Sequence, residues 1–383
     1  MPHGADYADV DMPKSEHRVH FGDSTNLSFV PDESVALVVT SPPYPMIEMW
    51  DAFFGQRDRE IAEALKTKDG RLAFELMHRD LDRVWAEVFR VLIPGGFACI
   101  NIGDATRKIG NGFCLYPNHS RILSECFKLG FEVLPLILWR KQTNAPNKFM
   151  GSGMLPAGAY VTLEHEYVLI LRKGSKREFE VSDKKLLRRS SAFFWEERNS
   201  WFSDIWDFKG TRQALEKAEA RSRSAAFPFE LAYRLINMYS ARLDTVLDPF
   251  LGTGTSSFAA MASGRNSIGV ELSAELLPVI REGLIAFSAM ANDYIAARLQ
   301  RHLDFCKRYE AEQGALKYTN SRFQCPVMTA QEVDLELEFV ETIVAEGDSS
   351  WQVSYAPIHE IAQPPRVAGS VAVNPSGQLA LTF

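Results

Sequence analysis

The sequence predicts an α/β protein with a mostly parallel, twisted sheet and helices on both faces. Short apolar runs rich in β-branched residues, such as Val35–Val39, are typical of strands buried on both faces. Stretches with apolar residues at helical spacing, such as 77–92, alternate with these runs, as in sheets built from crossover units. One complete unit of strand, glycine turn, helix and strand occupies 246–271.

The run Val35–Val39 ends in a Ser-Pro-Pro-Tyr turn at 41–44. Two successive prolines cannot continue a sheet, so the chain must leave the strand as a stiff turn. Prolines donate no N–H, which leaves the carbonyls of Ser41 and Pro42 free to accept hydrogen bonds from a ligand amino group. Pro43 completes the turn, and Tyr44 offers a flat face for stacking. The alternative is a strand-terminating turn with a packed tyrosine.

The unit at 246–271 has the features of a cofactor site. Glycines 252 and 254 let backbone N–H groups approach a ligand, and the helix that follows favours electronegative groups at its start. Glu271 ends the next strand, a position from which an acid commonly binds ribose hydroxyls. The candidate cofactor residues here are Asp248, Pro249, Phe250, Gly252, Gly254, Thr255 and Glu271.

Together, Asp-Pro-Phe-x-Gly-x-Gly-Thr and Ser-Pro-Pro-Tyr resemble the amino-group DNA methyltransferases that use S-adenosylmethionine. The catalytic motif precedes the glycine loop here, and this permuted order resembles the β class of that family. The likeness spans 19–274 and implies a Rossmann-like methyltransferase fold. It further implies double-stranded DNA as partner and a target base that is flipped out of the duplex.

The resemblance also implies roles for residues outside the two motifs. Asp23 would meet the adenine or amino group of the cofactor, and Phe227 and Pro228 would contact its methionine end. The alternatives are a turn or helix-capping aspartate and an ordinary helix start with proline. Asp104, at the end of strand 97–102, could hold the Ser41 hydroxyl or the substrate amino group, or be a plain turn aspartate.

The chain has 383 residues and a net charge of −7, which at first argues against a nucleic-acid partner. The charge is unevenly distributed, however. The segment 172–223 holds 14 basic and 9 acidic residues, whereas 323–383 holds one arginine and 8 acids. Because local charge decides where phosphates bind, the overall charge does not exclude DNA as a partner.

Basic pairs alternate with aromatic residues in 172–223, a pattern that suits groove contact and base readout. A solvated charged face is the alternative. A Gly/Pro/Asn-rich loop at 140–160 adds further basic residues. The candidate DNA contacts are Arg140, Lys141, Lys148, Lys184, Lys185, Arg188 and Arg189.

These patterns divide the chain into five parts. We expect a flexible arm (1–16), the catalytic half (17–171), a target-recognition region (172–223), the cofactor half (224–310) and an acidic extension (311–383). The extension could pack on the core, mediate dimerisation or compete with DNA for the basic surface. The sequence does not choose between these.

The five cysteines lack C-x-x-C spacing, so we expect buried small side chains and no metal site. No stretch resembles a signal peptide or membrane span, and a prokaryotic cytoplasm is the expected location.

A motif with serine before Pro-Pro-Tyr resembles that of the enzymes that methylate cytosine N4. The expected setting is a restriction-modification system with a cognate endonuclease. Aspartate or asparagine mostly accompanies adenine N6, which remains the nearest alternative. A Rossmann oxidoreductase or a non-catalytic DNA-binding relative is less consistent with the motifs, because the Asp-Pro-Phe start departs from G-x-G-x-x-G. A homodimer is compatible with the sequence.

Overall fold

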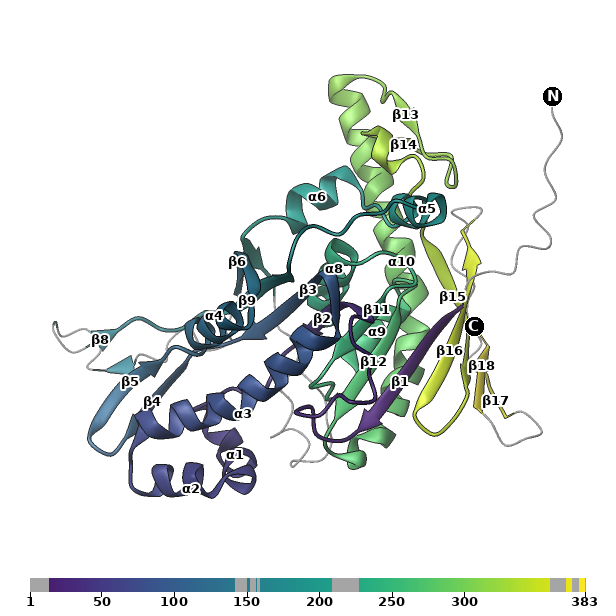
Figure 1. Ribbon diagram of the computed structural model, residues 1–383. Coiled ribbons are helices and arrows are strands. Elements are labelled where there is room, and N and C mark those ends of the chain that lie inside the picture. The colour runs from purple at the N-terminus through teal and green to yellow at the C-terminus, as the bar shows by residue number, and fades with distance from the viewer. Residues whose placement is uncertain are drawn as a thin grey trace, which may run out of the picture.

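The computed structural model describes residues 14–141, 150–151, 156, 159–208, 227–358, 370–373 and 379–382. Within them, a sheet of twelve strands forms the centre of the molecule in the order β10-β6-β9-β3-β2-β11-β12-β1-β16-β15-β18-β17 (Figure 1). The strands are β1 Ser15–Phe21, β2 Val35–Thr40, β3 Leu92–Ile102, β6 Phe131–Arg140, β9 His165–Lys173, β10 Ile205–Asp207, β11 Thr245–Asp248, β12 Asn266–Glu271, β15 Glu338–Ala345, β16 Ser350–Pro357, β17 Ser370–Val373 and β18 Leu379–Thr382.

The five central strands, from β3 to β1, are parallel. Antiparallel pairs flank them, with β9 next to β3 on one side and β16 next to β1 on the other. Three two-stranded hairpins lie outside this sheet: β4 Ala105–Ile109 with β5 Gly112–Tyr116, β7 Met150–Gly151 with β8 Ala159–Tyr160, and β13 Tyr318–Thr319 with β14 Pro326–Val327. The predicted α/β class with a parallel core is confirmed.

Helices cover both faces of the sheet (Figure 1). They are α1 Asp51–Arg57, α2 Arg59–Lys66, α3 Gly70–Val91, α4 Asn118–Leu129, α5 Ser182–Ser190, α6 Trp195–Trp201, α8 Phe229–Tyr239, α9 Thr255–Met261 and α10 Leu277–Gln313. Because side chains alternate along β2, Val38 packs into the core under α3 and α4, while Leu37 and Val39 pack into the core under α8, α9 and α10. No helix in these ranges is both long and apolar enough to cross a membrane.

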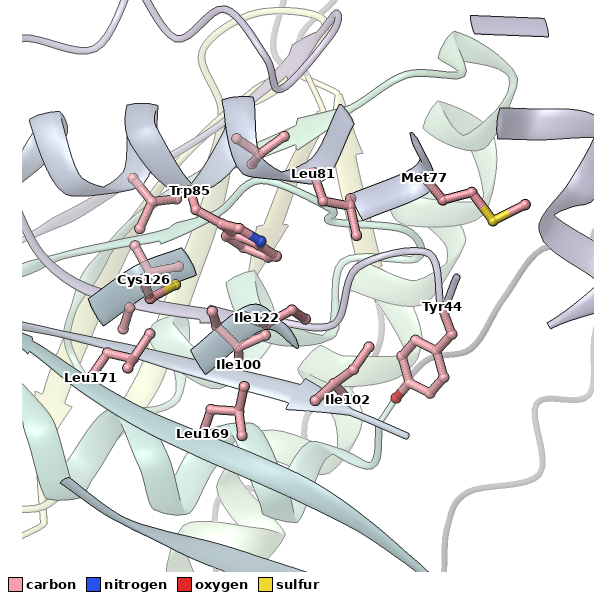
Figure 2. Packing of buried hydrophobic residues seen from close by; sticks show 14 of the residues in the cluster. Tyr44, Met77, Leu81, Trp85, Ile100, Ile102, Ile122, Cys126, Leu169 and Leu171 are labelled. Atoms are coloured by element: carbon pink, nitrogen blue, oxygen red, sulfur yellow. The ribbon is translucent and has the colours of Figure 1, made fainter. Parts of the chain in front are cut away.

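Helix α3 forms because its apolar positions recur at helical spacing and Asp69 caps its first turn by accepting a hydrogen bond from Leu72 N at 3.0 Å. Trp85 is fully buried at the centre of the resulting cluster, which Figure 2 shows between α3 and the sheet. The sequence places the next strand after Pro94-Gly95-Gly96, whereas β3 begins at Leu92 and includes them. Gly95 has a φ of +79°, and a side chain there would collide with the backbone of Arg177.

The ends of the chain differ from expectation. Ser15 and Glu16, assigned to a flexible arm, belong to β1, and the rest of that arm lies outside the described residues, apart from Lys14. The acidic extension does pack on the core, because β16 pairs with β1 and β15 with β16. Ser15 Oγ bonds Tyr355 OH at 2.6 Å across this junction. Helix α10 crosses the expected boundary at 310.

Among the cysteines, Cys99, Cys126, Cys306 and Cys325 are buried as predicted, whereas Cys114 is exposed on β5. Burial raises the pKa of the Cys99 thiol well above its ordinary value, so this thiol stays protonated at neutral pH.

The pairing of β16 with β1 makes a prediction about the C-terminal extension. Trp351 is 7% exposed and lies opposite His17. Trp351→Ala should lower the free energy of unfolding by about 3–5 kcal/mol, because it leaves a cavity in the core. Chemical denaturation measures this. Gln352→Ala, on the other face of β16, is the matched control, and equal stability of both variants would show that the extension does not fold with the core.

Candidate active site

The candidate site is built on the adjacent carboxyl ends of β2 and β11. Thr40, the last residue of β2, is fully buried and donates a hydrogen bond from Oγ1 to Asp248 Oδ1 at 2.6 Å. Asp248 also accepts bonds from Ser256 Oγ at 2.5 Å and Phe250 N at 3.0 Å. The Pro-Pro turn and the glycine loop are thus held together by one carboxylate.

Asp248 itself is 3% exposed. Burial raises the pKa of its carboxyl to about 6, although the hydroxyls of Ser256 and Thr40 oppose this shift. Asp248 therefore connects the two loops through hydrogen bonds. Its contact with a cofactor stays a prediction.

A second polar network begins at Ser41. Its Oγ lies 3.1 Å from Tyr44 OH, which lies 3.0 Å from Glu166 Oε2. Asn101 Nδ2 donates to both Tyr44 OH at 2.9 Å and Glu166 Oε2 at 2.7 Å. Lys141 Nζ forms an ion pair with Glu166 Oε1.

Asn101 and Glu166 were not singled out in the sequence. Asn101 lies near the end of β3, and Glu166 lies near the start of β9, which pairs with that end of β3 in the antiparallel sense. A polar residue at the end of a parallel strand was an available signal for Asn101. Glu166 carries no such signal, because only the antiparallel pairing brings it to this edge.

Tyr44 does not offer the open stacking face that the sequence suggested. The residue is 7% exposed and packs at the margin of the core cluster beside Ile102 (Figure 2). A side-chain carbon on Gly103 would lie 3.0 Å from the Tyr44 ring. The packed-tyrosine alternative therefore describes Tyr44 in this structure.

The candidate cofactor residues come together at the same edge of the sheet, where β1, β12 and β11 end next to one another. Gly22 N donates to Glu271 O at 2.9 Å, and Ser24 Oγ donates to the carbonyl of Pro249. The loops after β1 and β11 are thereby fixed to each other and to the end of β12.

Glu271 accepts hydrogen bonds from Gly252 N and Ser273 N, both at 2.9 Å. Burial raises the pKa of its carboxyl, while these backbone N–H groups oppose the shift. Each carboxylate oxygen keeps a second lone pair for a ligand hydroxyl. Gly252 has a φ of +57°, and a Cβ there would meet no atom within 4 Å. This open backbone beside a carboxylate fits a ribose-containing cofactor.

Four other residues were predicted to contact the cofactor. Asp23 forms a two-pronged ion pair with Arg57 at 2.9 and 3.1 Å. Partial burial by itself raises the pKa of Asp23, but the bonds from Arg57 outweigh this and the net shift is downward. Phe227 and Pro228 are buried at the start of α8, so their contact with a cofactor stays a prediction. Thr255 is the first residue of α9, after Gly254.

Asp104 does not contact Ser41. Its buried carboxylate accepts hydrogen bonds from His119 N at 3.1 Å and from His119 Nδ1 at 2.8 Å. It thereby holds the start of α4, and its contact with a substrate amino group stays a prediction.

The basic residues of α5 lie at the wrong edge of the sheet for the expected role. Strand β9 runs antiparallel to β3, so the chain leaves it at the edge where the parallel strands begin. Ser191, just after α5, accepts a hydrogen bond from Arg242 N at 2.8 Å, ahead of β11. Figure 1 shows α5 at the opposite end of the sheet from α1 and α2. The exposed cations placed there are Lys184, Lys185, Arg188 and Arg189.

Three aromatic residues of this region, Phe194, Trp201 and Trp206, are buried, so they do not form a base-reading surface. Trp195 and Phe202 are exposed. In the loop 140–160, Arg140 forms an ion pair with Asp207, and Lys141 is held by Glu166. Lys148 lies outside the described residues. Among the described residues, no cluster of three or more potential ligands could hold a metal ion.

This fold, with a Pro-Pro turn beside a glycine loop at one sheet edge, is typical of α/β enzymes that bind a ribose-containing cofactor beside a network of polar side chains. A family model described as DNA methylase, whose name joins N6 and N4, matches residues 35–282. The chain belongs to this family of DNA methylases.

Two archaeal relatives are similar over most of their length. The Type II methyltransferase M.MthZI of Methanothermobacter thermautotrophicus is 47% identical over 348 residues, which are 90% of this chain and 97% of the relative. The Type II methyltransferase M.MjaI of Methanocaldococcus jannaschii is 52% identical over 279 residues, 70% of this chain and 91% of the relative.

Solved structures agree with the fold. A protein of Thermus thermophilus, assigned as a DNA modification methylase and solved with S-adenosyl-L-methionine, is 34% identical, with a TM-score of 0.55 over 71% of this chain and 94% of that one. The cytosine-N4-specific PvuII DNA methyltransferase is 18% identical, with a TM-score of 0.50 over 73% of this chain and 93% of that one, and supports the fold alone.

The Glu271 geometry predicts a specific loss of cofactor affinity. Glu271→Ala removes the free lone pairs expected to accept ribose hydroxyls and should raise the dissociation constant of S-adenosylmethionine by about 10-fold or more. Calorimetry measures this directly. Glu275→Ala, an exposed neighbour, is the control, and an unchanged constant for the Glu271 variant would remove its ribose role.

Asp248 makes stability depend on pH. Because its folded pKa is about 6 against an ordinary 3.8, the folded protein keeps a proton that the unfolded chain loses between these values. The free energy of unfolding should therefore fall as pH rises from about 4 to about 6, by up to roughly 3 kcal/mol. Asp248→Asn should flatten this decline in urea unfolding across that range. An identical decline in the variant would assign the pH dependence to other groups.

Proposed function

We propose that this protein transfers a methyl group from S-adenosylmethionine to the exocyclic N4 of cytosine at a specific site in double-stranded DNA. The observation that carries the proposal is the half-buried Ser41 hydroxyl, which follows β2 directly beside the glycine loop after β11. This arrangement places a small acceptor for an amino group next to the cofactor residues.

The cofactor assignment rests on the open backbone at Gly252 and on the Glu271 carboxylate. It is supported by the 34% identical Thermus thermophilus structure, which contains S-adenosyl-L-methionine. When bound, this cofactor supplies an electrophilic methyl group. Glu271 would hold the ribose, and Gly252 would let the ligand approach the main chain.

The exocyclic amine is a poor nucleophile because its lone pair is conjugated with the ring. Acceptors at Ser41 Oγ and the carbonyl of Pro42 would bind the two amino hydrogens and favour the pyramidal nitrogen of the transition state. Alignment with the methyl donor then supplies much of the rate. No covalent enzyme intermediate is required.

The amine lies inside duplex DNA, so the base must be flipped out to reach Ser41. Because Tyr44 is packed in the core, its ring can stack on the base only after a local rearrangement. The duplex would approach the edge where β2 and β3 end.

Adenine N6 is the second candidate, because the matching family name includes both positions. Serine at position 41, in place of aspartate or asparagine, favours cytosine N4. The relatives are Type II methyltransferases, so a restriction-modification system with a cognate endonuclease in a prokaryotic cytoplasm is the setting we propose.

Identification of the methylated nucleoside tests this function. Purified protein, unmethylated genomic DNA and S-adenosylmethionine are incubated, and the digested DNA is analysed by mass spectrometry. N4-methylcytosine is the expected product. N6-methyladenine in place of N4-methylcytosine would overturn the base assignment. If neither methylated nucleoside were found, the proposed activity would be overturned.

Ser41→Ala provides the residue-level test. It should lower turnover by about 100-fold or more, because a transition-state hydrogen bond is lost, while S-adenosylmethionine affinity stays nearly unchanged. Loss of both together would contradict the separation of the amine-binding turn from the cofactor loop.

A further inference from the structure

In the hydrogen-bond network from Ser41 to Glu166, the chemistry of each group decides which atom donates and which accepts. Lys141 Nζ and Asn101 Nδ2 donate to Glu166, as expected for an ionised carboxylate, which only accepts. Tyr44 OH, 3.0 Å from Glu166 Oε2, must therefore donate its single hydrogen to that oxygen. Because this hydrogen is used, the Tyr44 oxygen must accept from Ser41 Oγ at 3.1 Å. The Ser41 hydroxyl points toward Tyr44, and its lone pairs remain for the substrate amine.

We propose that Glu166 is a positioning residue that orients the Ser41 hydroxyl through Tyr44 and receives, through the same chain, the proton that the amine loses on methylation. The inference deepens the proposed function and rests on it. It assigns a role to a side chain 122 residues beyond Tyr44 that only the antiparallel pairing of β9 with β3 brings to the site.

The proton transfer balances without an external reagent. The nitrogen lone pair forms the N–CH3 bond, the S–CH3 bond breaks with its electrons on sulfur, and the amine is left with one excess proton. That proton passes to Ser41 Oγ as the Ser41 hydrogen moves to Tyr44 and the Tyr44 hydrogen moves to Glu166 Oε2. Glu166 becomes neutral, both hydroxyls are restored, and the proton later leaves to solvent.

The surroundings suit this role. Burial and the nearby Glu166 charge raise the pKa of Tyr44 well above its ordinary value, so Tyr44 keeps a proton at rest and transmits one without becoming a stable phenolate. Among the residues that the structure describes, the titratable groups that bond to Glu166 are Tyr44, from the turn after β2, and Lys141, directly after β6. Asn101, from β3, adds a donor that does not titrate.

The network is held by close packing as well as by hydrogen bonds. A Cβ on Gly103 would lie 3.0 Å from Tyr44 Cε2 and 3.3 Å from Glu166 Cγ. Both side chains therefore lie against the backbone after β3 in a space that leaves no room for a larger residue. This contact fixes the Tyr44 ring and the Glu166 stem relative to Ser41.

Glu166→Gln tests the proposal, because glutamine keeps the size of the side chain and an acceptor oxygen but takes up a proton poorly. The single-turnover methylation rate should fall by about 100-fold, with S-adenosylmethionine affinity and thermal stability close to wild type. Glu132→Gln, exposed on β6, is the matched control and should match wild type in all respects.

Tyr44→Phe interrupts the chain at its middle and leaves the Glu166–Lys141 pair in place. Its rate should fall to a similar extent, and the Y44F/E166Q double variant should be no slower than the slower single variant, because both changes remove one relay. Multiplicative losses in the double variant would overturn the relay. These results are distinct from a failure of the proposed function, in which wild type itself would methylate no base.

Discussion

The site depends on the hydrogen bond between Thr40 and Asp248, residues that lie 208 positions apart. Parallel strands bring their carboxyl ends to one edge but do not fix the loops that follow them. One buried carboxylate does so here, because Asp248 accepts bonds from the end of β2, from its own loop at Phe250 and from α9 at Ser256. The Ser-Pro-Pro-Tyr turn and the glycine loop are consequently held together. Such a tie suits an enzyme in which methyl donor and acceptor must align closely.

The carboxylates at this edge of the sheet fall into two kinds, according to the groups that they bind. Asp248 and Asp104 accept hydrogen bonds from backbone N–H groups and from neighbouring side chains, and their carboxylates are buried. Glu271 keeps lone pairs for a ligand, whereas Glu166 is connected to Ser41 through Tyr44. Four carboxylates near one edge thus have different tasks, and the difference arises from which donors the fold places against each one.

The acidic extension accounts for the unusual charge distribution. Its strands complete the sheet beside β1, and its acids are paired with arginines from other parts of the chain. Glu336 and Glu338 bind Arg242, which lies just before β11, and Asp334 is 3.6 Å from Arg189 of α5. The negative charge of the tail is therefore partly neutralised by Arg242 and by Arg189 of the basic middle in the folded protein.

The sequence by itself determined the α/β class, the parallel core, the Ser-Pro-Pro-Tyr turn and the glycine unit ending in Glu271, because each follows from local pattern and chain stiffness. Tertiary structure alone decided which residues face the site. The antiparallel pairing of β9 with β3 brings Glu166 to Tyr44 and directs the chain toward α5 at the opposite edge of the sheet. The antiparallel pairing of β16 with β1 adds the C-terminal extension to the sheet. Tyr44, Trp201 and Trp206 are likewise buried in the core, whereas the sequence suggested exposed aromatic surfaces. Pairing partners and burial arise from contacts between distant segments, and no local pattern of residues encodes them.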